Sequence, residues 1–102
     1  ENQLSCVPAA LVELTALTHL YLSMNQISSV PEEIAGLTAL HVLYLHGNKL
    51  ENVPAALGQL TALTELTLSD NPQLKSVPAE LGALVTQGVV RMERSVVVEV
   101  AV

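Results

Sequence analysis

The side chains best suited to metal binding or proton transfer in this 102-residue chain lie close together in HVLYLHGN, residues 41–48. This stretch holds His41, Tyr44 and His46, in a chain with three histidines and two tyrosines. Imidazole nitrogens bind zinc and exchange protons near neutral pH. Ser69 and Asp70 add a potential nucleophile and a carboxylate. Whether these residues form a metal site, a catalytic site or part of a binding surface depends on the direction of each side chain.

A repeat with a period of 23 residues determines those directions. The segments LTHLYLSMNQISSVPEEIAGLTA (17–39), LHVLYLHGNKLENVPAALGQLTA (40–62) and LTELTLSDNPQLKSVPAELGALV (63–85) align, and the third has one extra residue before Leu74. Residues 2–16 read as the second half of an earlier unit. The recurring positions are Leu17, Leu40 and Leu63, then Leu20, Leu43 and Leu66, then Leu22, Leu45 and Leu68, and finally Asn25, Asn48 and Asn71, with Asn2 as the asparagine of the half unit.

These positions resemble the leucine-rich repeat family, in the 23-residue form LxxLxLxxNxLxxVPxxLxxL. The resemblance covers residues 2 to about 84 and recurs in every unit. It implies an α/β fold: a short right-handed solenoid with a parallel sheet on its concave face and short helical turns on its convex side. The units are similar to those of cytoplasmic signalling adaptors and plant receptors, but the family does not specify a ligand.

The residue pattern supports this architecture independently. Alternation in LYL and LTL places leucines on one strand face and Tyr21 on the other. The asparagine that follows each strand is expected to bond the turning backbone and to stack on the asparagine of the next unit. Pro31, Pro54 and Pro78 suit the first position of a helical turn. Since one unit cannot bury its apolar face alone, neighbouring units are expected to stack.

The outward positions of the strands define a candidate partner-binding face. Tyrosine and histidine combine apolar area with a polar tip, which is typical of interaction hot spots. The register places Tyr21 beside Tyr44, about 5 Å away on the next strand. The alternative is a solvated sheet face that tolerates these residues for their strand propensity. The predicted face consists of His19, Tyr21, Ser23, Met24, Val42, Tyr44, His46, Glu65, Thr67, Ser69 and Asp70.

The repeat argues against a metal site or a catalytic site. His41 and His46 have opposite strand parity, and His19 is offset from His46 by roughly 13 Å along the strands. Ser69 next to His46, with Asp70, superficially resembles a catalytic triad, but Asp70 adjoins the serine instead of orienting the histidine. The glycines are dispersed and form no phosphate-binding loop. We therefore expect no metal, no cofactor and no enzymatic activity.

Composition narrows the partner classes further. The net charge is −6, and Lys49, Lys75, Arg91 and Arg94 are too scattered to form a nucleic-acid surface. No apolar run is long enough to span a membrane, and no signal peptide is visible. Cys6 is the single cysteine of the chain, and it is either an incidental thiol or a partner in an intermolecular disulfide. The lack of a disulfide framework favours a cytoplasmic location.

The two ends of the stack leave alternatives open. The first residue, Glu1, indicates a processed or excised fragment, and the half unit there is either truncated or covered by another molecule. We divide the chain into a repeat domain, residues 1–88, and a degenerate last repeat with a valine-rich strand, residues 89–102. In the latter, Val90 and Met92 keep the two inward positions. The valine strand is a cap, a self-associating edge or a remnant of a neighbouring element.

The sequence thus predicts a protein-binding module that uses its strand face, acting as a scaffold in signalling. Glu65 and Asp70 favour a partner that presents basic groups. The alternative function is a structural or self-associating fragment, a homo-oligomer formed through the valine-rich tail or the N-terminal edge.

Overall fold

A computed structural model describes residues 7, 11, 13–92 and 96–98 of the chain. Asn2, Cys6, Arg94 and residues 99–102 lie outside the described residues. Within the described part, no helix is long and apolar enough to cross a membrane.

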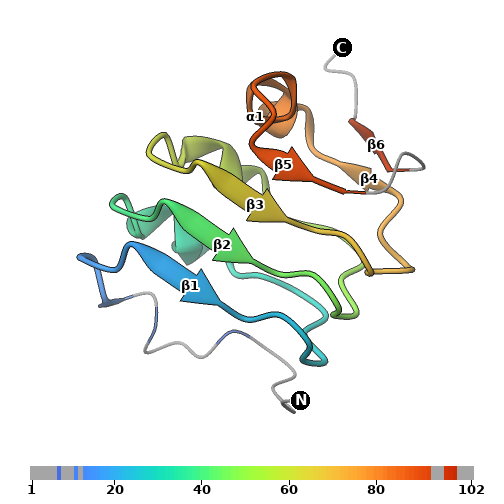
Figure 1. The fold of residues 1–102 in the computed structure, drawn as a ribbon, viewed down its shortest axis with the longest axis horizontal. Helices are drawn as coiled ribbons and strands as arrows, with labels where there is room; N and C mark the ends of the chain where they lie inside the picture. Colours follow the sequence, from blue (N-terminus) through green and yellow to red (C-terminus); the bar gives the residue numbers. More distant parts are fainter. Residues whose placement is uncertain (1–6, 8–10, 12, 93–95, 99–102) are drawn as a thin grey trace.

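The described residues form a four-stranded parallel sheet with helical turns on one face (Figure 1). Its strands follow the chain order: β1 (His19–Tyr21), β2 (Val42–Tyr44), β3 (Glu65–Thr67) and β5 (Val90–Arg91). The β1–β2 and β2–β3 pairs keep the offset of the sequence repeat, with Leu20 opposite Leu43 and Leu43 opposite Leu66. The expected parallel sheet is therefore confirmed, and its register is that of the repeat.

The core lies between the sheet and the helical turns. Leu43, Leu45, Leu66 and Leu68 are buried to 1% exposure or less, because alternate strand residues share the inner face. Val90 and Met92 are partly buried and pack against this core. Aliphatic layers from successive units thus form one continuous core.

Short 3₁₀ helices supply the other wall: η2 (Glu32–Gly36), η3 (Ala55–Gln59) and η4 (Ala79–Leu81). Each buries one apolar residue: Ile34 in η2, Leu57 in η3 and Leu81 in η4. Pro31, Pro54 and Pro78 precede these helices in extended conformation, so the expectation that they occupy the first helical position was wrong by one residue. The carbonyl oxygen of each proline accepts the first hydrogen bond of the helix. Proline can fill this role because it lacks only the backbone N–H, and its carbonyl is intact.

The asparagine that follows each strand is buried and bonded to backbone, as predicted. Asn48 Oδ1 accepts hydrogen bonds from the backbone N–H groups of Asn25 (3.2 Å) and Ile27 (3.1 Å). Its Nδ2 donates to the carbonyls of Leu22 (3.0 Å) and Leu45 (2.9 Å). One side chain therefore connects its own unit to the preceding one. Asn71 repeats the pattern, donating to the carbonyl oxygens of Leu45 and Leu68 and accepting from Leu50 N–H.

The third unit continues differently from the others. After the extra residue, β4 (Ser76–Val77) pairs in parallel with β6 (Val97–Val98), forming a separate two-stranded sheet. The helix α1 (Gly82–Thr86) then leads into β5 (Figure 1). Val96 is buried, Val98 packs against the core and Val97 is exposed. Within the described residues 96–98 of the valine-rich segment, β4 thus pairs with one edge of β6.

We expect Asn48→Ala to lower the free energy of unfolding by about 3 kcal/mol, because buried backbone groups in two units lose their partners. Chemical denaturation followed by circular dichroism measures the change. Asn52→Ala is the matched control, since Asn52 is exposed and should change stability by about 0.5 kcal/mol or less. Equal effects of the two substitutions would contradict the role of the buried asparagine.

Candidate functional site

Four aromatic rings form a continuous row on the outer face of the sheet. Tyr21 stacks on Tyr44 with ring centroids 4.9 Å apart and an interplanar angle of 28°. His19 meets Tyr21 edge-on at 6.1 Å, and His46 lies 5.8 Å from Tyr44. Tyr21 is 61% exposed, whereas Tyr44 is half-buried. The parallel register of β1 and β2 produces this stack, since Tyr21 and Tyr44 are directly paired.

A polar network continues from the aromatic row across the next two strands. Tyr44 Oη donates a hydrogen bond of 3.0 Å to Glu65 Oε1. Arg91 Nε on β5 lies 3.3 Å from Glu65 Oε2. The hydrogen bond to Glu65, followed by desolvation and by the negative charge of Glu65, raises the pKa of Tyr44 above its ordinary value of 10.0. Glu65 is thus already paired within the chain, which weakens our expectation that it attracts basic groups of a partner.

Arg91 was missed as a site residue in the sequence analysis. It comes from the degenerate last repeat, where only the inward residues Val90 and Met92 follow the pattern. The signal that could have revealed it is its register, because Arg91 pairs with Thr67 and so falls on the same row as Tyr21 and Tyr44. The last repeat therefore contributes to the outer face as well as to the core.

Thr67 was expected to be exposed on this face, and this expectation was wrong: it is 8% exposed. Its hydroxyl accepts a hydrogen bond of 3.1 Å from the backbone N–H of Leu45 and lies 2.9 Å from His46 Nδ1. A short side chain between larger neighbours is covered by them, so Thr67 supports the orientation of His46. The hydrogen-bond partner of His46 is therefore Thr67, and His46 and Ser69 share no hydrogen bond among the described residues.

The turn after each of β1, β2 and β3 has a left-handed residue that the sequence analysis did not identify. Met24, Gly47 and Asp70 occupy the same repeat position with φ of 60°, 74° and 57°. Left-handed backbone is rare for residues other than glycine, and Gly47 was the signal for it in the sequence. Each turn brings the following asparagine under the sheet, and it leaves Met24 51% exposed beside the aromatic row.

The remaining predicted face residues differ in their exposure. Val42, Ser23 and Ser69 are half-buried, and His19 and Asp70 are exposed. The hydroxyl of Thr18 lies 3.0 Å from His19 Nδ1. His41 is off this face, as expected, with Nδ1 2.8 Å from the carbonyl oxygen of Ala39. We define the strand face as His19, Tyr21, Met24, Tyr44, His46, Glu65 and Arg91.

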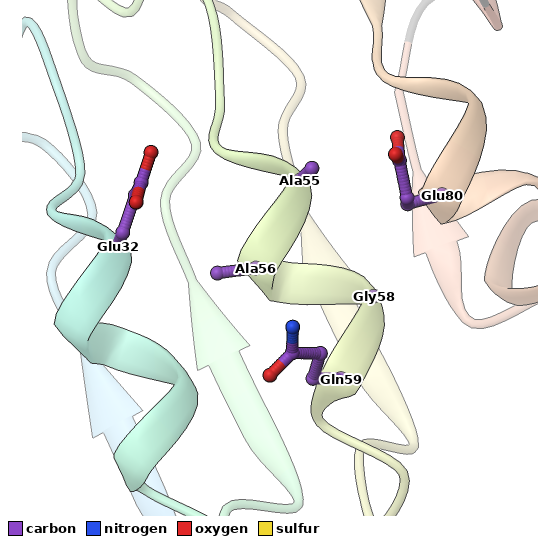
Figure 2. A pocket seen from close by; sticks show the side chains of 6 residues that line it. All are labelled: Glu32, Ala55, Ala56, Gly58, Gln59 and Glu80. Atoms are coloured by element: carbon purple, nitrogen blue, oxygen red, sulfur yellow. The ribbon is translucent and has the colours of Figure 1, made fainter.

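The opposite, helical side carries a cavity of about 420 Å³, shown in Figure 2. It is lined by Glu32 of η2, by Ala55, Ala56, Gly58 and Gln59 of η3, and by Glu80 of η4. Three of the six lining residues are alanine or glycine, and Gly58 permits close packing of η3 on η4. A Cβ atom added to Gly58 would lie 2.5 Å from the carbonyl oxygen of Glu80.

The described residues contain no group of three or more histidine, cysteine, aspartate or glutamate side chains arranged to hold a metal ion. The contacts on the strand face are ring stacking, a tyrosine–carboxylate hydrogen bond and an ion pair. These are the interactions by which a preformed surface recognises another macromolecule.

A parallel sheet built from 23-residue units, with a buried asparagine after each of β1, β2 and β3, defines a repeat protein. The chain belongs to the leucine-rich repeat family: the family model described as "Leucine Rich repeats (2 copies)" matches residues 15–56 and 38–81. Members of this family generally mediate protein–protein interactions and are typically not enzymes. No curated protein matches the chain.

The raised pKa of Tyr44 gives a test of the polar network. Below pH 10 the phenol is protonated in both folded and unfolded chains, so the stabilisation is fully present there. It is lost as the pH rises through the folded pKa, because the unfolded chain ionises first. We expect Glu65→Gln to lower the pKa of Tyr44, measured by tyrosinate absorbance. Tyr44→Phe should lose less stability than the wild type over the same pH range, and an unchanged titration in Glu65→Gln would contradict the network.

Gly58 and Gly82 provide opposite predictions for the helical side. Gly58→Ala should lower the free energy of unfolding by about 1 to 3 kcal/mol, because the added methyl group meets the Glu80 backbone. Gly82→Ala should be neutral or raise stability by about 0.5 kcal/mol, since Gly82 has helical dihedral angles and its nearest new contact is Val98 Cγ1 at 3.9 Å. Thermal denaturation of both variants distinguishes these results, and stabilisation by Gly58→Ala would refute the close packing.

Proposed function

We propose that this chain is a protein-binding module that recognises its partner on the strand face, and that its units form a short right-handed solenoid with this face concave. The observation that supports the proposal most strongly is the exposed and prearranged aromatic row. Tyr21 presents most of its ring to solvent, yet Tyr44 and His19 hold it on two sides. A ring positioned before binding loses little conformational entropy when a partner covers it.

Glu65 and Arg91, the charged residues of the strand face, are paired with each other, so apolar contact and hydrogen bonding dominate the interactions that this face offers. The Glu65 carboxylate is hydrogen-bonded by Tyr44 and ion-paired with Arg91. Because this pair is internally neutral, long-range attraction contributes less than contact area does. We therefore expect an anchor formed by Tyr21, Tyr44 and Met24, surrounded by the imidazoles and the Glu65–Arg91 pair.

Catalysis receives no support from the described geometry. His46 contacts Thr67, which is buried and also accepts a backbone N–H, so this hydroxyl is poorly placed as a nucleophile. The cavity on the helical side is lined by alanine, glycine, glutamine and two exposed glutamates, without a histidine or cysteine. We infer that the chain acts by binding.

The test begins with a partner captured by the wild-type chain, identified and then purified. The double variant Tyr21→Ala with Tyr44→Ala should weaken its binding at least about tenfold, because it removes two aromatic anchors. Isothermal titration calorimetry measures the dissociation constant. The variant should lose about 1 kcal/mol of stability or less, which separates lost binding from unfolding.

The control variant is Thr38→Ala with Thr61→Ala, which changes exposed turn residues outside the strand face. Its affinity for the partner should equal that of the wild type. If the tyrosine variant binds with unchanged affinity, the strand face is not the binding site; if the threonine variant alone loses binding, the site lies in the turns.

A further inference from the structure

We propose that Met24 is an oxidation site, at which a peroxide converts the exposed thioether into a sulfoxide and makes this part of the strand face polar. The reaction itself does not depend on the proposed partner binding. Its consequence for a partner rests on the proposed function, because Met24 belongs to the anchor of the strand face. The chain has two methionines, Met24 and Met92, and their surroundings differ.

The first support is the contrast in exposure between the two methionines. Met24 is 51% exposed, whereas Met92 is partly buried and packs against the hydrophobic core. The rate at which a methionine is oxidised follows the access of the oxidant to its sulfur. A peroxide therefore reaches Met24 in the folded chain, and it reaches Met92 more readily when the last repeat opens.

The second support is the position of the Met24 sulfur against Gly47. A Cβ atom added to Gly47 would lie 2.5 Å from Met24 Sδ, so the sulfur occupies the space that a side chain at position 47 would fill. The backbone N–H of Met24 also donates a hydrogen bond of 3.0 Å to the carbonyl oxygen of His46. The thioether is thus placed beside the unit that carries Tyr44 and His46, and a chemical change at the sulfur acts at the strand face.

The reaction is a transfer of one oxygen atom. A lone pair of the sulfur attacks one oxygen of hydrogen peroxide, so that an S–O bond forms and the O–O bond breaks. The departing hydroxide takes the proton of the transferred oxygen and leaves as water; the sulfur is oxidised by two electrons and the peroxide is reduced. The sulfoxide is polar and accepts hydrogen bonds, so it no longer suits an apolar contact. Since about half of Met24 already meets solvent, water can hydrate the new oxygen without unfolding the chain.

Oxidation kinetics of the two methionines test the site in a Cys6→Ser background, where no thiol consumes peroxide. Cleavage after glutamate places them in separate peptides, residues 14–32 and 81–93, and mass spectrometry follows the gain of one oxygen atom. We expect Met24 to react at least about tenfold faster than Met92 in the folded chain, and the two rates to converge in guanidinium. Equal rates in the folded chain, or a faster reaction of Met92, would overturn the proposal.

Retention on a phenyl matrix tests the effect on the surface. After brief treatment with hydrogen peroxide the chain should elute earlier, while its free energy of unfolding stays unchanged. Met24→Leu should keep the original retention and abolish the effect of peroxide, and Met92→Leu should remain as sensitive as the unsubstituted chain. A shift that persists in Met24→Leu, or one that is accompanied by unfolding in circular dichroism, contradicts the assignment.

Both measurements use the chain without a partner, so their failure rejects the oxidation site alone. Unchanged affinity of the variant Tyr21→Ala with Tyr44→Ala rejects the proposed function alone.

Discussion

The buried asparagine ladder is the interaction on which the rest of the molecule depends. Each asparagine side chain donates to a carbonyl oxygen of the strand in its own unit. Asn48 and Asn71 also donate to a carbonyl oxygen of the preceding unit. Leu22 O and Leu45 O therefore each accept hydrogen bonds from two asparagine side chains. A shift of one residue between units would break all of these bonds at once. The ladder therefore adds to the burial of the inward leucines in opposing slippage of a sheet whose strands have only two or three residues.

The surface follows from that register. Strict alignment of β1 and β2 places Tyr21 against Tyr44, and the same alignment places the smaller Thr67 next to Tyr44. The threonine cannot extend the aromatic stack, so its hydroxyl meets Leu45 N–H and the imidazole of His46 instead. On the neighbouring row, Glu65 is close enough to accept the Tyr44 hydroxyl proton in a hydrogen bond and to pair with Arg91. One fixed offset thus generates an aromatic end and an ionic end on a single face.

The repeat predicted the inward leucines, the buried asparagines, the parallel sheet and the pairing of Tyr21 with Tyr44, because each depends only on strand parity and the 23-residue offset. It could not predict how far a side chain is covered by neighbours on adjacent rows, which is why Thr67 was assigned to the exposed face. Arg91 escaped attention because the last unit retains few repeat residues. The left-handed turns at Met24 and Asp70 were hidden because their residue types rarely adopt that conformation.

The two edges of the main sheet differ physically. Beside β5, the chain adds α1, and β6 pairs with β4, so aliphatic side chains such as Val96 and Val98 pack on the last layers of the core. Beside β1, the described structure provides an uncharged strand with exposed Tyr21 and Met24. In a repeat protein each unit is stabilised by its neighbours, so the packing at the end of the stack affects the stability of the last unit. The same regularity that aligns the inner strands therefore ends at β5, where Val96 and Val98 pack on the last layers of the core in place of a further full unit.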